Sequence, residues 1–112
     1  GDGTQTRCFS LVYEVVGCIL ALLDTPSSVG LAVNIGSTDE ISILDLARIV
    51  REKTGSSSET VIVPYDEAYP KDFEDMQRRV PDISRLMGLI GFSPQAGIGE
   101  IIDRILASEP PV

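Results

Sequence analysis

Residues 31–63 read LAVNIGSTDEISILDLARIVREKTGSSSETVIV. The apolar run 31–35 and the β-branched run 61–63, which is closed by Pro64, each favour a short strand. Between them the apolar residues recur at three- and four-residue steps from Ser42 onward, which predicts a helix. Strand, helix and strand in this order indicate an α/β fold.

The sequence marks both ends of this helix. Ser42 suits the N-cap, and Asp45 brings a carboxylate to the positive helix end in a capping-box-like arrangement. Gly55 suits the left-handed conformation that closes many helices. The expected apolar stripe consists of Ile43, Leu44, Leu46, Ala47, Ile49 and Val50.

The remaining segments extend the pattern. Residues 5–10 are expected to be extended, and residues 11–24 have the spacing of an amphipathic helix that stops before Pro26. Further helices are expected up to Leu89, capped by Asp82 or Ser84, and over residues 98–107. We therefore predict an α/β domain with a small sheet of about three strands flanked by helices.

Residues 64–80 form a long, polar and charged segment. A loop of this length in a compact domain is either functional or disordered, and its aromatic residues argue against disorder. Its carboxylates do not have the spacing of a calcium loop, and they are interpreted as solvated charge; they are Asp66, Glu67, Asp72, Glu74 and Asp75.

The net charge of −8, with only nine Lys and Arg residues, disfavours nucleic acid and anionic membranes as partners. The longest apolar run, residues 15–23, is short for a bilayer, which requires roughly 20 residues. No signal peptide is visible, so a cytoplasmic location is expected. Cys8 and Cys18 lie in apolar stretches and are predicted to be buried free thiols, with a disulfide as the alternative.

Several catalytic and metal-binding patterns are missing from the 112 residues. There is no histidine, which excludes Ser/His and Cys/His nucleophile pairs and leaves the cysteines without a metal-ligand partner. Neither Gly-x-Gly-x-x-Gly nor Tyr-x-x-x-Lys occurs. The adjacent Arg78 and Arg79 precede a helix start and suit phosphate; pairing with nearby carboxylates is the alternative. Arg7, between a turn and a strand, has the same two interpretations.

Five motifs occur in a fixed order: GDGTQTRCF at residues 1–9, the helix after it, VNIG at 33–36, RRVPDI at 78–83 and GFSP at 91–94. Together they resemble the C-terminal third of extended short-chain dehydrogenase/reductases acting on nucleotide sugars. That family includes UDP-glucose 4-epimerases, dTDP-glucose 4,6-dehydratases and UDP-glucuronate decarboxylases. The similarity covers nearly all of the chain.

The resemblance implies that residues 1–112 are a nucleotide-sugar-binding region with residues 64–80 as its substrate-side loop. It implies that Arg7 contacts the diphosphate and that Arg79 closes over the diphosphate or sugar from the loop. Arg78 becomes a second contact, Asn34 lies beside the substrate, and Gln5 lines the same pocket. Two guanidinium groups from separate elements would clamp a diphosphate.

The family's NAD-binding Rossmann half and its catalytic tyrosine, lysine and serine or threonine precede the similar segment. The resemblance therefore implies that NAD is a cofactor of the parent enzyme, whereas this chain alone is expected to bind none and to be inactive. We expect a broken gene or a companion chain, and an apolar face that packs on the missing half or forms a homodimer. The alternative is a stand-alone binding or interaction module without enzymatic activity.

One position departs from the family pattern. Leu11 replaces the aromatic of the usual Ser-Tyr-Val-x-Asp, and the residues that follow in the acidic region are Tyr13 and Glu14. Leucine has no hydrogen-bond donor, so a substrate contact by that tyrosine would be lost. The nucleotide, the sugar and the choice among epimerase, dehydratase and decarboxylase are not given by the residues present.

Overall fold

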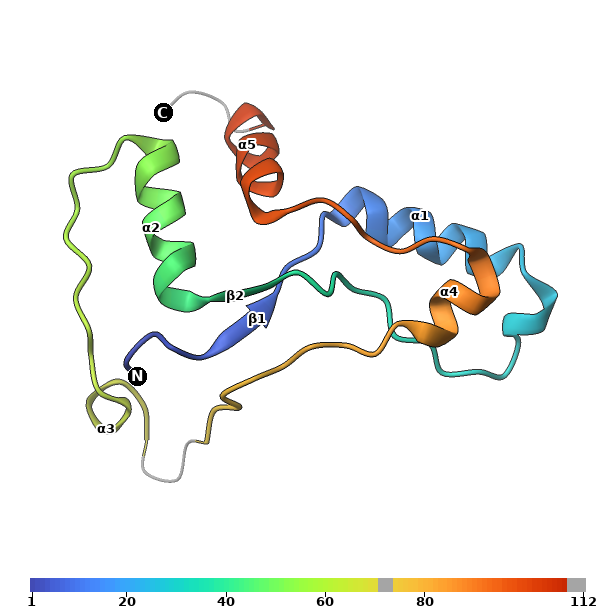
Figure 1. The fold of residues 1–112 in the computed structure, drawn as a ribbon, viewed down its shortest axis with the longest axis horizontal. Coiled ribbons are helices and arrows are strands. Elements are labelled where there is room, and N and C mark those ends of the chain that lie inside the picture. The colour runs from blue at the N-terminus through green and yellow to red at the C-terminus, as the bar shows by residue number, and fades with distance from the viewer. Residues whose placement is uncertain (71–73, 109–112) are drawn as a thin grey trace. The chain divides into compact units, whose positions relative to one another are not determined.

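The computed structural model describes residues 1–70 and 74–108, so the expectations for Lys71, Asp72, Phe73 and the tail 109–112 lie outside the described residues. Figure 1 shows the order of the elements. They are β1 (Thr6–Cys8), α1 (Val12–Leu23), a 3-10 turn (Pro26–Ser28), β2 (Glu40–Ser42), α2 (Ile43–Thr54), α3 (Tyr65–Ala68), α4 (Ser84–Ile90) and α5 (Ile98–Ser108). The predicted α/β class is confirmed.

The chain forms two compact units, each made of two segments that are distant in the sequence. The sheet unit comprises Gly1–Arg7 and Glu40–Arg79, and the helical unit comprises Cys8–Asp39 and Val80–Val112. All of the arginines singled out from the sequence belong to the sheet unit.

In the sheet unit, β1 pairs with β2 in a two-stranded sheet. Thr6 also forms an isolated parallel bridge with Arg78, and its amide donates to the carbonyl of Gln77 at 2.8 Å. Three segments of the chain, including the end of the predicted loop, therefore meet at Thr6. The loop itself contains the short helix α3.

Helix α2 has the ends that the sequence predicts. The Ser42 Oγ accepts from the Asp45 amide at 3.0 Å and donates to the Asp45 Oδ2 at 2.7 Å. Gly55 closes the helix in the left-handed conformation, with φ of 64°. These contacts satisfy backbone groups that a helix end would otherwise leave unpaired.

Two predicted strands are wrong. Residues 31–35 and 61–63 are not strands, and Leu31 and Val61 are 47% and 74% exposed. Their β-branched composition reflects a preference for packing on a sheet, and no described segment pairs with them. Strand β2 was not predicted, because three residues are too few to show the alternation of apolar and polar residues that is typical of a strand. The sheet thus has two strands rather than about three.

In the helical unit, α1 packs against α4 and against the 3-10 turn. Leu11, Ala96 and Ile101 form a core cluster on which Phe9 packs. Leu11, the residue that departs from the family pattern, is 6% exposed, so its role here is in the core. Helix α4 ends at Ile90, one residue beyond the expected Leu89, and Gly91 follows in the left-handed conformation with φ of 76°.

Cys8 and Cys18 do not form the alternative disulfide, and the predicted burial of the thiols holds for Cys18 but not for Cys8. Cys18 is fully buried and Cys8 is half-buried. Burial, and secondarily the charge of Glu14, raises the pKa of the Cys18 thiol. Within residues 1–70 and 74–108, no helix has both the length and the apolar character needed to cross a membrane.

Candidate functional site

The Thr6–Arg78 bridge brings both of these side chains to the carboxylate of Glu40. Arg78 donates from Nε to Glu40 Oε1 at 2.9 Å and from Nη2 to Oε2 at 3.0 Å. The Thr6 hydroxyl donates to the same carboxylate. Arg78 is therefore engaged in a bidentate ion pair, which is the structural alternative that the sequence left open for it.

The contribution of this ion pair to the stability of the fold depends on pH, because Glu40 must be ionised to form it. The hydrogen bond from Thr6, followed by that from Arg78, lowers the pKa of Glu40 from its ordinary value of 4.5. A carboxyl group with a lowered pKa in the folded state contributes stability above its unfolded pKa, and this contribution is lost as the pH falls through the folded pKa.

We expect Glu40→Gln to destabilise the chain at pH 6 and to have progressively less effect as the pH falls below 4.5. The two proteins should converge in acid because Glu40 is then protonated in both folded and unfolded states. Urea midpoints of the wild type and the variant between pH 6 and pH 3 measure the difference directly. A difference that is constant over this range would contradict the assignment.

Arg7 is held from three directions. Its Nη1 donates to the carbonyl of Thr6 at 2.6 Å and to that of Met76 at 2.8 Å, and its Nη2 forms an ion pair with Asp75. The Arg7 and Asp75 side chains are 22% and 23% exposed. A guanidinium has five N–H donors, so these contacts with described residues leave two for other acceptors.

Arg79 differs from its neighbour. It is exposed, and no carboxylate of the described residues forms an ion pair with it. Side chains alternate between faces along extended segments. Because Thr6 and Arg78 are paired, Arg7 and Arg79 are expected on the opposite face, together with Gln5.

Gln5 carries an unsatisfied polar atom. Its Oε1 is buried and has no hydrogen-bond partner among the described residues. The side chain lines a pocket of about 300 Å³ in the sheet unit, along with Ile43 and Leu44. A buried acceptor without a donor costs free energy, so a donor from a ligand would be favourable here.

Asn34 belongs to the helical unit, whereas Arg7, Arg78 and Arg79 belong to the sheet unit. Its Nδ2 donates to the carbonyl of Asp82 at 3.1 Å. It lines a pocket of about 220 Å³ with Ala32, Ser84 and Arg85, and Arg85 donates to the carbonyl of Ala32 at 2.7 Å. Arg85 is not among the residues predicted from the sequence, although its place in the first turn of a predicted helix, close to Asp82, is a signal for such a contact.

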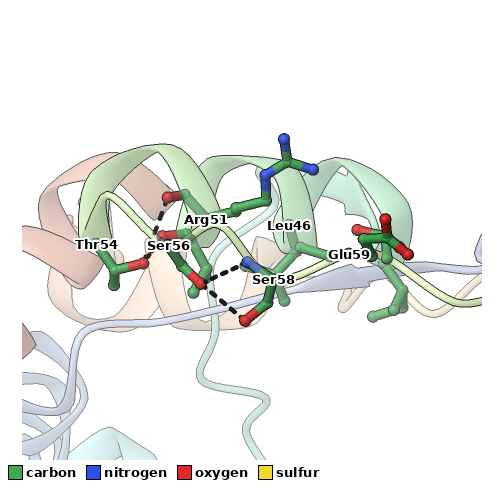
Figure 2. Close-up of a pocket in the computed structure, with 10 residues that line it drawn as sticks. Leu46, Arg51, Thr54, Ser56, Ser58 and Glu59 are labelled. Carbon is green, nitrogen blue, oxygen red and sulfur yellow. Dashed lines mark hydrogen bonds between the residues drawn. The ribbon is translucent and has the colours of Figure 1, made fainter.

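A further pocket of about 480 Å³ lies along α2. Figure 2 shows Arg51, Thr54, Ser56 and Ser58 around it. Its apolar wall consists of Ile43, Leu46, Ala47 and Val50. None of the predicted substrate residues lines this pocket, so the arginine group remains the better candidate for an anion.

No family model matches the sequence. The chain is 42% identical over 94 residues to a UDP-N-acetyl-alpha-D-glucosaminuronate decarboxylase from Bacillus cytotoxicus, covering 84% of this chain and 29% of that protein. It is 34% identical over 106 residues to UDP-glucuronic acid decarboxylase 1 from Xenopus tropicalis, covering 95% of this chain and 23% of that protein. The chain thus spans less than a third of the length of these relatives.

The solved structures similar to this chain include sugar-nucleotide epimerases. Epimerase Mth375 from Methanothermobacter thermautotrophicus has a TM-score of 0.82 at 27% identity, with 93% of this chain and 30% of that chain covered. The UDP-glucuronic acid 4-epimerase from Bacillus cereus in complex with UDP-glucuronic acid and NAD has a TM-score of 0.74 at 27% identity, with 92% and 31% covered. The resemblance to NAD-dependent nucleotide-sugar enzymes stated from the sequence is confirmed, and the matched segment makes up about 30% of each of these solved chains.

Proposed function

We propose that this chain is the C-terminal region of an extended short-chain dehydrogenase/reductase and that it binds the diphosphate of a nucleotide sugar. Arg7 and Arg79 are the proposed ligands of the diphosphate, and Gln5 faces the same ligand. The observation that carries the proposal is the pairing of Thr6 with Arg78. It sets the register from which Arg7 and Arg79 are expected on one face.

The electrostatics of the chain support this assignment. With a net charge of −8, the protein as a whole repels anions, so an anion requires a local group of cations. Arg7 keeps two N–H donors, and Arg79 has no ion pair with any described residue. Two guanidinium groups with donors to spare match the oxygens of a diphosphate, which accepts bidentate hydrogen bonds.

A UDP-sugar is the proposed ligand, and decarboxylation of a UDP-uronic acid is the reaction we favour for the parent protein. The two curated relatives described above are both UDP-uronate decarboxylases by name. The epimerase of similar fold was solved with UDP-glucuronic acid. By the same resemblance, Asn34 and the loop 64–80 are each proposed as substrate contacts of the parent protein.

NAD is the proposed cofactor of the parent protein, as in the Bacillus cereus epimerase complex. The residues of this chain do not fit the group, because no strand–turn–helix with a Gly-x-Gly-x-x-Gly turn is present in its sequence. Tyr-x-x-x-Lys is also missing. We therefore propose that this chain contributes substrate binding to the parent protein, and that the catalytic groups lie in another part of it.

The exposed face of α1 is the proposed contact surface for an NAD-binding region. Val12, Val16, Leu20 and Leu23 follow one another at four- and three-residue steps and are 46–76% exposed. An apolar stripe of this kind favours burial against a partner. The relatives are more than three times longer than the matched segment, so they contain a region that can supply such a partner.

We expect Leu20→Glu to abolish binding of this chain to a separately produced part of the Bacillus cytotoxicus relative that lies outside the matched segment. Gel filtration of the mixture measures complex formation, and Ser27→Glu, on the exposed 3-10 turn, is the matched control. Self-association that is lost in Leu20→Glu, without complex formation by the wild type, would instead identify a second copy of the chain as the partner.

Calorimetric titration tests the diphosphate assignment. UDP is expected to bind at least about tenfold more tightly than UMP, because the second phosphate adds charge-assisted hydrogen bonds. Raising the salt concentration should weaken the binding of UDP, since the contact is ionic and partly exposed. Equal affinities for UDP and UMP would contradict a diphosphate clamp.

A further inference from the structure

Arg7 is the better fixed of the two proposed phosphate ligands. An unrestrained arginine loses considerable side-chain entropy when it binds a ligand. Here the carbonyls of Thr6 and Met76 hold Nη1, and Asp75 holds Nη2. Contacts from two segments of the sheet unit therefore fix the plane of the guanidinium before any ligand arrives.

Asp75 uses both of its carboxylate oxygens in this arrangement. Its Oδ1 accepts from Arg7, and its Oδ2 accepts from the Tyr65 hydroxyl at 3.0 Å. Tyr65 stands at the start of α3, and its ring centroid lies 6.1 Å from that of Tyr69. The carboxylate is thus held on one side by the tyrosine and holds the arginine on the other.

The tyrosine keeps its proton in this contact. Burial, followed by the hydrogen bond to Asp75, raises the pKa of Tyr65 above its ordinary value of 10.0. At neutral pH the hydroxyl is therefore a donor, and Asp75 is an acceptor for both of its neighbours. A donor on each side orients the carboxylate without a second positive charge.

We propose that Asp75, supported by Tyr65, is a positioning residue that orients Arg7 so that its two remaining N–H donors face the nucleotide-sugar diphosphate. The inference rests on the proposed function of Arg7 and names a part of the same site. Asp75 lies 68 residues from Arg7 in the sequence, within the loop of residues 64–80. The loop thereby contributes to the site through a carboxylate as well as through its arginines.

The test uses the 15N-labelled arginine Nε–H signals of the 112-residue chain, with the Arg7 signal assigned from Arg7→Lys. Without ligand, Asp75→Ala should increase the mobility and the hydrogen exchange of the Arg7 Nε–H. Asp75→Asn, which keeps an oxygen acceptor, should restore most of the wild-type behaviour. Tyr65→Phe should have a smaller effect in the same direction. Asp66→Ala, an exposed carboxylate of α3, should leave the signal unchanged.

A second arm adds UDP to the same samples. We expect a shift of the Arg7 signal in the wild type and an affinity about tenfold lower in Asp75→Ala, with no further loss when Asp75→Ala is combined with Arg7→Lys. An Arg7 signal that is equally ordered in Asp75→Ala, or tighter UDP binding by that variant, would overturn the positioning role. A wild type whose arginine signals do not respond to UDP would instead overturn the proposed function, while the ligand-free arm still decides the inference.

Discussion

Replacing Arg79 with alanine is expected to weaken the binding of UDP-glucuronic acid by about ten- to a hundredfold, the range for loss of hydrogen bonds to a charged group. The reason is that Arg79 is exposed and forms no ion pair with a carboxylate of the described residues. Its donors are not already committed, so most of its interaction with a phosphate is lost on truncation. Calorimetric titration measures the change.

Three variants separate this contact from a general effect of charge. Arg48→Ala removes the same charge from the outer face of α2, where the guanidinium pairs with Asp45, and should leave the affinity nearly unchanged. Arg79→Lys should give an intermediate loss, because an ammonium group cannot form the bidentate contact. Arg78→Ala should weaken binding less than Arg79→Ala, since Glu40 already binds its guanidinium. Equal losses in Arg48→Ala and Arg79→Ala would reduce the effect to long-range electrostatics.

The different environments of Arg78 and Arg79 could not be predicted from the residues around them. The residue types alone do not distinguish two adjacent arginines; the resemblance puts Arg79 before Arg78, and the register of the bridge gives the physical difference between them. That register depends on Thr6, whose amide pairs with a carbonyl more than 70 residues away in the chain. Arg7 was recognised as a candidate, whereas its contact with Asp75 could not be predicted, because nothing local to either residue specifies it.

The helices and strands also differ in how far they could be predicted from the local sequence. Helix α2 was predicted with its cap residues because Ser42, Asp45 and Gly55 act on their own backbone neighbours. The expected strands at 31–35 and 61–63 failed because a strand requires a partner, and the partner is not encoded in the strand itself. Leu11 could be recognised from the sequence as a departure from the family pattern. Its packing with Ala96 and Ile101 in the core cluster could not be predicted, because these residues are distant in the sequence.

The second large effect is expected from Leu86→Ala, which should lower the free energy of unfolding by about 2–5 kcal/mol. Leu86 is fully buried and lies on α4, which packs against α1. Truncation removes methyl groups from the interior and leaves a cavity that the surrounding helices fill only in part. Since small domains are stable by only about 5–15 kcal/mol, the variant should unfold at a much lower urea concentration.

The adjacent residue provides the control for this prediction. Met87 is 43% exposed on the same helix, so Met87→Ala removes a side chain of comparable size and should cost less than about 1 kcal/mol. Urea denaturation followed by circular dichroism compares the two variants. Equal destabilisation would show that the loss comes from the helix itself and not from packing between α1 and α4.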